Sequence, residues 1–573
     1  MENQTLIKFE NFTFKYKSQQ EPTLKNINFK ARKGEKIVII GPSGSGKSTM
    51  AKAINSQIPN TFAGDIKGKV TILDKDIENS SIFDISLLVG SVLQDTDGQF
   101  VGLTVLEDIA FSLENDNVCQ EKMIEIVKMW ANNLSIVSLL DHKPNEISGG
   151  QKQRVSLAGV LVSETPILLL DEPLANLDPA SGLATMRLVD ELNKKYNYTV
   201  IVIEHRLEEA LNLNPDRILV VDEGEILKDD SPSAILKSDI LAKIGVRKPL
   251  YINALEYAAI DLSRIQNLGS FDNITLSKND KDMLKSWADK INIIDSSYKK
   301  EAILKVKDLS FAYDGYNPIL KDVNFTINKG DVISIVGQNG AGKSTLAKLL
   351  CGFLRPSRGQ ILLNDTDTKN LSIKQIAEKI GYVLQNPNAM ISKTNVSEEV
   401  GFGLKLRGAS KEEIDFKTEK VLKICGLFPF RNWPISALSY GQKRRVSIAS
   451  ILILNPEILI LDEPTAGQDY RHYTEIMEFI HKLNKDYNLT ILMISHDMHL
   501  IQEYTQRSLV FAETGLLADT SPKTLFSDVD LLEKASLAET SLSKLARAID
   551  YDPEEFIEKF ISYERGELWM IKY

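Results

Sequence analysis

The chain has 573 residues, of which 43% are hydrophobic, 25% charged and 7% aromatic, and its formal net charge is −10. This length suggests roughly three to five domains or two large ones, and the composition is that of a folded globular protein rather than a disordered one. The acidic balance argues against a nucleic-acid-binding protein, which usually carries a basic face.

Cysteines and apolar stretches exclude further classes. The three cysteines, Cys119, Cys351 and Cys425, form no CxxC pair. The sequence therefore predicts neither a zinc ribbon nor a disulfide framework and is typical of a reducing compartment. The amino-terminal stretch lacks the basic and apolar regions of a signal peptide. No window approaches about 18 uninterrupted apolar residues, so we expect no membrane-spanning helix.

The chain repeats itself in ordered motifs. GPSGSGKST at 41–49 recurs as GQNGAGKST at 337–345, and ILLLDEP at 167–173 recurs as ILILDEP at 458–464. The offset is 296 residues at the first motif and 291 at the second, so a short indel separates two collinear copies. We predict four segments: an ATPase domain at 1–240, a helical appendage and linker at 241–300, a second ATPase domain at 301–525 and a carboxy-terminal helical appendage at 526–573.

Each copy predicts the same order of elements. Aromatic or alternating strands come first, at 7–16 and 303–313, and short β-branched strands follow at 36–40 and 332–336. Helical runs then alternate with apolar strands, among them TVIVIEH and TILMISH. This rhythm predicts an α/β fold: a mainly parallel sheet core covered by helices. The stretches after about Ser231 and Ser521 are expected to be helical.

The pattern GxxxxGK[ST] occurs twice, each time between an apolar strand and a helix-forming run, which is the context of a phosphate-binding P-loop. Glycines let main-chain N–H groups approach the phosphates, and the lysine neutralises the β- and γ-phosphates. A chance glycine-rich turn is the alternative for a single match, but two matches in register make it negligible. The predicted phosphate-binding residues are Gly41, Pro42, Ser43, Gly44, Ser45, Gly46, Lys47, Ser48 and Thr49, and Gly337, Gln338, Asn339, Gly340, Ala341, Gly342, Lys343, Ser344 and Thr345.

Acidic residues end a buried apolar strand in both copies. Asp171 and Asp462 are expected to hold Mg²⁺ together with the hydroxyls of Ser48 and Ser344. The next residues, Glu172 and Glu463, are candidate general bases for an attacking water. A solvated acidic turn is the alternative interpretation, and the recurrence of DEP at both strand ends disfavours it.

Further motifs resemble those of ABC ATPases with two nucleotide-binding domains in tandem. The signatures ISGGQ and LSYGQ, the Q-loop glutamines Gln94 and Gln385, and the switch histidines His205 and His496 carry this resemblance. So do the D-loops ANLD at 175–178 and AGQD at 466–469, with Asp178 and Asp469. Each fold would then add an antiparallel β subdomain and a helical subdomain to its P-loop NTPase core.

The resemblance implies roles for these residues. Both histidines would contact the γ-phosphate, and both Q-loop glutamines would serve catalysis and Mg²⁺. The signature of one domain would close on the ATP held by the other, through Ser148, Gly149, Gly150 and Gln151, and through Ser439, Tyr440, Gly441 and Gln442. Tyr16 and Tyr313 precede the P-loop lysines by 31 and 30 residues and would stack on adenine, with core packing as the alternative.

One departure from the family pattern concerns the second signature. Tyr440 replaces its first glycine, so one N–H approach to the phosphate is altered. Both copies nevertheless keep the lysine, aspartate, glutamate and histidine. We therefore expect two hydrolytic sites, which need not be equal.

The segments that contain the Q-loop glutamines read VLQDTDGQFVGLTVLEDIAFSLEN at 92–115 and VLQNPNAMISKTNVSEEVGFGLKLRG at 383–408. Within ABC ATPases, they resemble the corresponding segments of energy-coupling-factor (ECF) importers. This resemblance implies a transmembrane coupling subunit docked on a groove that includes Gln99 and Phe100, a substrate-binding membrane subunit, no nucleic acid, and a place at the cytoplasmic face of the membrane. Generic helical-domain surface is the alternative for that groove. Such importers carry vitamins, their precursors or transition-metal cations, and nothing in this sequence selects among them.

Other ABC classes fit less well. Only 101 residues separate Lys47 from Ser148, which leaves no room for the long coiled coil of chromosome-maintenance ATPases. Excision-repair ATPases carry cysteine zinc modules. Ribosome-associated tandem ABC proteins remain the rival, although their linker is usually a long charged helical arm, whereas this linker contains GVRKPLYINALEYA.

Overall fold

The computed structural model describes the chain except residues 1–3, 95–96, 176, 293–300, 467 and 571–573. It divides into two compact units, Met1–Trp287 and Ala288–Tyr573. Each unit contains one copy of the repeated motifs and has its own antiparallel sheet, mixed sheet and helices. The predicted α/β fold with two similar halves is confirmed.

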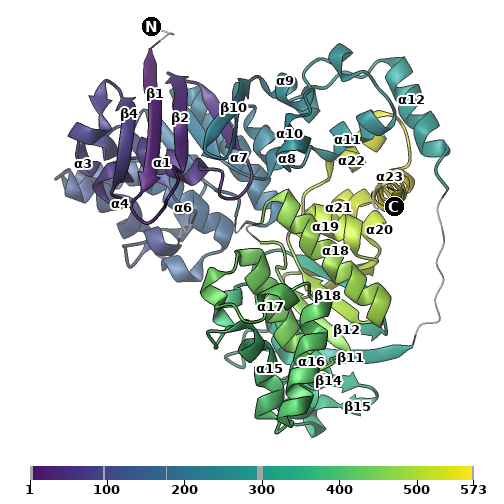
Figure 1. Ribbon diagram of the computed structural model, residues 1–573. Helices are drawn as coiled ribbons and strands as arrows, with labels where there is room; N and C mark the ends of the chain where they lie inside the picture. Colours follow the sequence, from purple (N-terminus) through teal and green to yellow (C-terminus); the bar gives the residue numbers. More distant parts are fainter. Residues whose placement is uncertain (1–3, 95–96, 176, 293–300, 467, 571–573) are drawn as a thin grey trace. The chain divides into compact units, whose positions relative to one another are not determined.

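The antiparallel sheet of unit 1 has the order β2-β1-β4-β5, and its longer strands lie side by side in Figure 1. Its strands are β1 (Thr5–Tyr16), β2 (Leu24–Arg32), β4 (Gly64–Ile72) and β5 (Lys75–Asp76). Phe9, Phe12 and Phe14 of β1 are fully buried, because one face of the sheet packs on the core. Asn11 takes a positive φ of 49° where the register of β1 shifts, so a bulge lies between these phenylalanines.

The mixed sheet of unit 1 has the order β10-β9-β3-β8-β7-β6. All neighbouring pairs are parallel except β9 with β10. The strands β3 and β8 are buried along their whole length, as expected for parallel strands covered on both faces. The six strands are β3 (Lys36–Ile40), β6 (Val89–Val92), β7 (Ile167–Asp171), β8 (Thr199–Ile203), β9 (Arg217–Asp222) and β10 (Glu225–Asp230).

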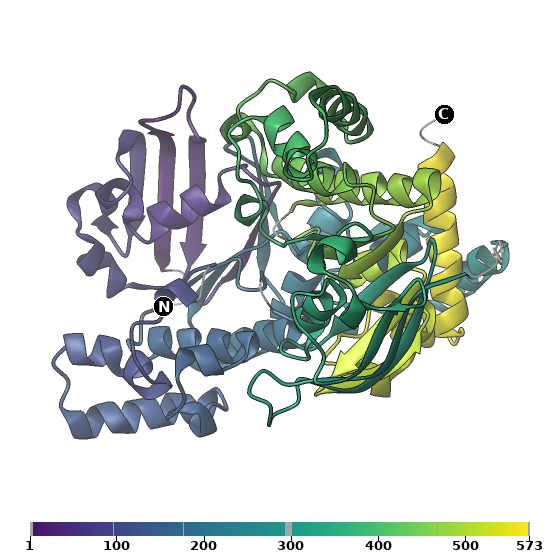
Figure 2. The same ribbon diagram turned by 90° about the horizontal axis from the view of Figure 1, so that it is seen from below.

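Two groups of helices in unit 1 carry or follow the motifs. Helices α1 (Lys47–Ile54) and α7 (Pro179–Tyr196) follow the P-loop and the D-loop. Helices α4 (Val105–Asn115), α5 (Gln120–Asn133) and α6 (Gly149–Leu161) pack on one another as a helical subdomain, drawn in blue in Figure 2. Thr104 begins α4 through a capping box with Glu107, which fixes where the helical subdomain starts.

Unit 2 repeats this arrangement with sheet orders β12-β11-β14-β15 and β16-β17-β18-β13-β19-β20. Its strands are β11 (Ala302–Phe311), β12 (Leu320–Asn328), β13 (Val332–Gly337), β14 (Arg358–Leu363), β15 (Thr366–Asp367), β16 (Ile380–Val383), β17 (Ile458–Asp462), β18 (Thr490–Ile494), β19 (Arg507–Ala512) and β20 (Gly515–Thr520). Its main helices are α13 (Lys343–Leu350), α15 (Val396–Leu406), α16 (Lys411–Ile424), α17 (Tyr440–Leu452), α18 (Tyr470–Tyr487) and α19 (Met498–Tyr504).

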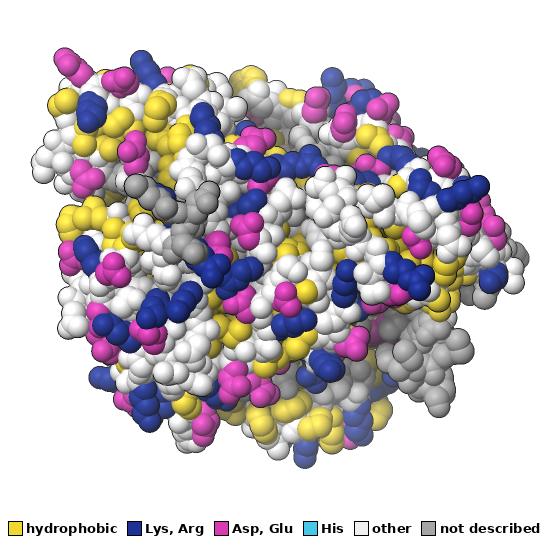
Figure 3. Space-filling model, turned by 90° about the horizontal axis from the view of Figure 1, so that it is seen from above, with side chains coloured by type: hydrophobic (Ala, Val, Ile, Leu, Met, Phe, Trp, Pro, Cys, Tyr) yellow, Lys and Arg dark blue, Asp and Glu magenta, His cyan; other side chains and the backbone are white. Residues whose placement is uncertain are grey.

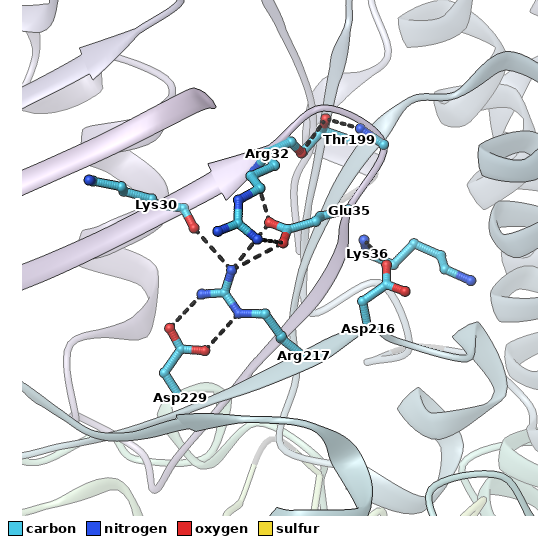
Figure 4. Close-up of polar contacts among 9 residues, drawn as sticks. Lys30, Arg32, Glu35, Lys36, Thr199, Asp216, Arg217 and Asp229 are labelled. Atoms are coloured by element: carbon cyan, nitrogen blue, oxygen red, sulfur yellow. Dashed lines mark hydrogen bonds and ion pairs between the residues drawn. The ribbon is translucent and has the colours of Figure 1, made fainter. Parts of the chain in front are cut away.

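An arginine joins the two sheets of each unit. Arg217, the first residue of β9, pairs with Asp229 on β10 through two N–O contacts of 2.8 and 2.5 Å. The third guanidinium nitrogen of Arg217, Nη1, lies 3.2 Å from both the Glu35 carboxylate and the main-chain oxygen of Lys30 on β2 (Figure 4).

In unit 2, Arg507 makes the corresponding contacts with Asp519 and the main-chain oxygen of Thr326. In each unit, these hydrogen bonds and ion pairs link the antiparallel sheet to the mixed sheet.

Short helices follow each mixed sheet. In unit 1 they are α9 (Pro232–Leu236), α10 (Ile240–Lys243), α11 (Leu250–Tyr257) and α12 (Lys278–Asp289), of which α12 extends just past the boundary between the units. In unit 2 they are α20 (Pro522–Ser527), α21 (Val529–Lys534), α22 (Ser541–Ala548) and α23 (Pro553–Met570). Part of the predicted linker, 293–300, lies outside the described residues, and the domain boundaries given above stay predictions. Across the described parts of the chain, no helix is long and apolar enough to cross a membrane.

Candidate active sites

The P-loops have the predicted strand–loop–helix geometry. Gly46 and Gly342, with φ of 105° and 87°, precede α1 and α13 in the left-handed region that favours glycine. The Lys47 ammonium donates to the main-chain oxygens of Gly41 at 2.8 Å and Pro42 at 2.9 Å, and Lys343 makes the same two contacts in unit 2. Each lysine is thus held inside its own loop, where a phosphate would meet it.

The candidate adenine-stacking tyrosines lie beside the P-loop helices. The Tyr16 hydroxyl is 3.3 Å from Thr49 Oγ1, and the Tyr313 hydroxyl is 3.3 Å from Thr345 Oγ1. Tyr16 packs edge-on against Phe62, whereas the Tyr313 side chain is 60% exposed. Each hydroxyl thus lies beside the first turn of a P-loop helix, and adenine stacking stays a prediction.

In unit 1, three predicted catalytic residues from different loops meet. The Gln94 side-chain amide donates to the Glu172 carboxylate at 2.6 Å, and His205 Nδ1 lies 4.0 Å from the other Glu172 oxygen. Glu172 has a positive φ of 49°, which is uncommon for a residue with a side chain and recurs at functional sites. Burial and the neighbouring Asp171 raise the pKa of Glu172, as a general base requires.

In unit 2, Asp462 and Glu463 are the corresponding acids. His496 Nε2 lies 3.5 Å from the Glu463 carboxylate, and Glu463 also has a positive φ, of 45°. Burial, followed by the charge of Asp462, raises the pKa of Glu463 to about 8. The Tyr382 hydroxyl donates to Asp462 at 2.7 Å, whereas Ser91 occupies the matching position on β6.

The residues at the end of β7 fit Mg²⁺. Asp171 Oδ1 is buried and has no hydrogen-bond partner among the residues that the structure describes, which leaves an anionic oxygen for a cation. In the described part of the chain, no cluster of three or more His, Cys, Asp or Glu side chains could hold a metal alone. Ser48, Asp171 and Gln94 would therefore share the ion with nucleotide phosphates, as Mg²⁺ commonly requires. Ser344, Asp462 and Gln385 would do so in unit 2.

Both signatures begin a helix through a capping box. Ser148 caps α6 and Ser439 caps α17, and each hydroxyl accepts the N–H of a glutamine three residues later. Gln151 and Gln442 return the bond by accepting the serine N–H at 2.8 and 2.9 Å. The spacing Ser-x-x-Gln predicts such a box, a signal that motif matching alone passes over.

The D-loop aspartates are also helix caps. Asp178 accepts the N–H of Ser181 at 2.9 Å at the start of α7, and Asp469 accepts that of His472 at 2.9 Å at the start of α18. Both aspartates are buried. Asn176 and Gly467, which belong to the predicted D-loops, lie outside the described residues.

Gln99 supports the Q-loop of unit 1. Its side chain accepts the N–H of Leu93 at 3.0 Å and donates to the oxygen of Ser91 at 3.2 Å, so it bridges the strand that leads to Gln94. Phe100 is half-buried. The predicted docking role of these two residues stays a prediction.

The sequence reasoning missed a buried acid beside the switch histidine. Glu204 is fully buried and accepts the N–H groups of Leu174 at 3.0 Å and His205 at 3.1 Å. Burial raises its pKa to about 7. The sequence signal for this acid is a glutamate at the end of the apolar run TVIVIEH. Acidic residues are rarely fully buried unless they have partners, so a glutamate in such a run indicates a special environment.

Two P-loops, each with a strand-end acid pair, a histidine and a serine-capped signature helix, define a tandem P-loop ATPase of the ABC type. The family model described as "ABC transporter" matches residues 24–175 and 320–466, and one described as "ATP-binding cassette cobalt transporter" matches 238–311. The chain belongs to the ABC transporter ATP-binding proteins, and it is an ATPase.

Relatives match over nearly the whole chain. One from Enterococcus faecalis, named "Putative ABC transporter ATP-binding protein", is 51% identical over 98% of both chains. One from Clostridium perfringens with the same type of name is 50% identical over 99% of this chain and 100% of its own. A solved structure of cbiO1 from Clostridium perfringens, described as part of the ABC transporter complex cbiONQ, is 33% identical and covers 44% of this chain and 100% of its own, with a TM-score of 0.39.

Proposed function

We propose that this chain is the ATP-hydrolysing motor of an ECF-type membrane importer. The observation that carries this proposal is the match of residues 238–311 to the family model described as "ATP-binding cassette cobalt transporter". These residues lie largely in the helical appendage of unit 1, which a minimal ABC ATPase domain does not need. The names of the relatives give no support to a ribosome-acting protein.

Exposed apolar side chains on the helical subdomains support docking of transmembrane partners there. In unit 1, Leu103 is 80% exposed and Phe111 on α4 is 43% exposed. In unit 2, Phe416 on α16 is 71% exposed and Trp433 is 46% exposed. Large exposed apolar areas are typical of protein–protein contact sites. We propose that coupling helices of a transmembrane subunit bind these surfaces, and that a separate membrane subunit binds the solute.

Surface charge also favours protein partners over nucleic acid. On the face shown in Figure 3, Lys and Arg side chains are interspersed with Asp and Glu. A nucleic-acid-binding face usually gathers basic residues. We propose that the chain acts at the cytoplasmic face of a membrane on an importer of vitamins, their precursors or transition-metal cations.

The proposed cycle uses composite sites. ATP on Lys47 would be closed by Ser439 and Gly441, and ATP on Lys343 by Ser148 and Gly149, because a serine-capped helix start presents a hydroxyl and N–H donors to an anion. Glu172 and Glu463 would each take a proton from the attacking water, while His205 and His496 orient that site. Bound Mg²⁺ would neutralise charge on the phosphates. Loss of the γ-phosphate would then release the two units from each other.

Co-purification from solubilised membranes tests this proposal. The tagged full chain is expected to recover a transmembrane coupling subunit and a substrate-binding membrane subunit. Leu103→Asp is expected to reduce that recovery at least about tenfold, since a charge in an apolar contact is costly. Leu227→Asp is the matched control, because Leu227 is 45% exposed on β10, away from the helical subdomain. Recovery of ribosomal subunits without membrane protein would overturn the importer proposal.

A further inference from the structure

We propose that Arg444 and Tyr440 form a clamp that positions the Q-loop of unit 2, and that this clamp makes the two ATP sites unequal. We name the pair the Q-loop clamp. The inference rests on the ATPase activity of the family and on the expected role of Gln385 at the metal. It does not depend on which membrane partner the chain serves.

The clamp is a set of contacts within unit 2. The Arg444 guanidinium donates to the main-chain oxygen of Gln385 at 2.5 Å, and the Tyr440 hydroxyl reaches the same oxygen at 3.4 Å. The guanidinium carbon lies 5.7 Å from the centre of the Tyr440 ring. Residues four apart on a helix lie on the same face, so both side chains of α17 point to the Q-loop together.

The Arg444 side chain makes its contact with the Q-loop from a buried position. Arg444 is 1% exposed, and its Nε has no hydrogen-bond partner among the described residues. A buried guanidinium is costly unless it is compensated by acceptors and nearby negative charge. Burial lowers the pKa of Arg444, and Tyr440, Glu463 and Asp462 oppose that shift and favour the charged form. Arg444 is therefore a buried cation that links the Q-loop carbonyl electrostatically to the two acids of the same site.

Unit 1 has different residues at both positions. Gly149 and Gln153 occupy on α6 the places of Tyr440 and Arg444 on α17, and Gln153 is a buried neutral amide. Glycine has no side chain that could reach the Q-loop. In unit 1 the Q-loop is instead contacted by Gln99, and Gln94 itself reaches Glu172.

The clamp affects how Gln385 is positioned in the site. The clamp joins the Q-loop directly to the first turns of the signature helix, so a displacement of α17 moves the Gln385 backbone with it. In unit 1 no side chain at position 149 can transmit such a displacement. The tyrosine that departs from the family pattern thus acts on its own Q-loop, as a positioning residue and not through contact with the reacting atoms.

Hydrogen exchange on the full chain without nucleotide tests the clamp directly. In Arg444→Gln, which installs the residue type of unit 1, amides of the Q-loop peptide around Gln385 are expected to exchange about tenfold faster, because local opening sets exchange. Gln153→Ala is the matched control in unit 1 and is expected to leave the Q-loop peptide around Gln94 unchanged. Arg444→Lys keeps a buried cation but loses the guanidinium contact, and it is expected to show the same faster exchange if Arg444→Gln folds poorly.

A second readout separates positioning from general stability. In a Glu172→Gln background, where turnover reports the unit 2 site, Arg444→Gln is expected to raise the Mg²⁺ concentration for half-maximal activity about fivefold, with ATP affinity changed less than about twofold. Wild-type exchange at the Gln385 peptide in both Arg444 variants would overturn the proposal. So would a loss of activity with unchanged Mg²⁺ dependence.

Discussion

Glu204 shows how a single buried carboxyl group can organise a catalytic loop. It lies directly before His205, accepts three main-chain N–H groups, and lies near the charges of Arg206 and Glu172. Ser495 occupies its position in unit 2, so this feature belongs to the first site. Since the fold raises the pKa of Glu204 to about 7 from 4.5, the native state binds a proton that the unfolded chain would release.

This pKa predicts a pH-dependent stability. The contribution of protonated Glu204 is fully present below pH 4.5 and is lost as the pH rises through about 7. Glu204→Gln mimics the neutral acid, so we expect its melting temperature to fall less between about pH 5 and pH 8 than that of the wild type. Calorimetry at several pH values measures this, with Glu223→Gln as an exposed control. An unchanged pH slope would show that Glu204 is not the titrating group.

The hydrogen bond from Tyr382 to Asp462 predicts a pH effect on ATPase activity that is confined to the second site. Its hydrogen bond lowers the pKa of Asp462 against the larger opposing effect of burial. Tyr382→Phe removes that bond, so Asp462 would be protonated at higher pH and would hold Mg²⁺ less well there. We expect the acid limb of ATPase activity to shift to higher pH in a Glu172→Gln background and not in a Glu463→Gln background. Equal profiles with and without Tyr382→Phe in the first background would contradict this role.

The residues that the sequence identified lie in local motifs, whereas those it missed depend on contacts between distant parts of the chain. Glu172 and His205 lie at fixed places in local motifs, so the sequence predicted them, and the structure brings them together with Gln94. Tyr382 and Asp462 are separated by 80 residues, and their contact depends on β16 lying next to β17. Motif spacing carries no information on such a pair.

At the scale of elements, we expect the arginine that joins the two sheets of each unit to stabilise that unit. Arg217→Ala removes a two-pronged ion pair with Asp229 and contacts with Glu35 and Lys30. The side chain is 24% exposed. We expect a loss of about 1–3 kcal/mol and a lower melting temperature of unit 1, since the pair is partly buried and charge-assisted.

Arg507→Ala is the matching change in unit 2 and is expected to lower the melting temperature of that unit by a similar amount. Arg264→Ala is the control, because the Arg264 side chain is 84% exposed in its pair with Asp261. Exposed pairs contribute about 0–1 kcal/mol. A melting temperature for Arg217→Ala equal to that of Arg264→Ala would contradict a joining role.

The sequence predicted the major elements better than their ends. The strand expected at 36–40 is β3 as observed, and the one expected at 332–336 is β13, which ends at Gly337. The run TVIVIEH predicts a strand that His205 follows, and β8 ends at Ile203, one residue before the buried Glu204. The bulge at Asn11 depends on pairing with neighbouring strands, which no local pattern specifies.

At the scale of the whole molecule, the two units share one topology and differ in the charges around their sites. Unit 1 has Glu204 and Arg206 where unit 2 has Ser495 and Asp497. Unit 2 in turn has Arg444 where unit 1 has a neutral glutamine. Besides its P-loop lysine, each unit therefore has an arginine near its catalytic acids, and the two arginines come from different elements. We therefore propose two working ATP sites whose catalytic residues are held by different neighbouring side chains.

Turnover of the base variants tests this account most directly. Glu172→Gln and Glu463→Gln each remove one proton acceptor while leaving the P-loop lysine in place, and binding of a fluorescent ATP analogue serves as the control for folding. We expect each single variant to lower ATP turnover without abolishing it, and the double variant to lose at least about a hundredfold. Turnover that is unchanged in Glu463→Gln and abolished in Glu172→Gln would contradict the account, because only one site would then hydrolyse ATP.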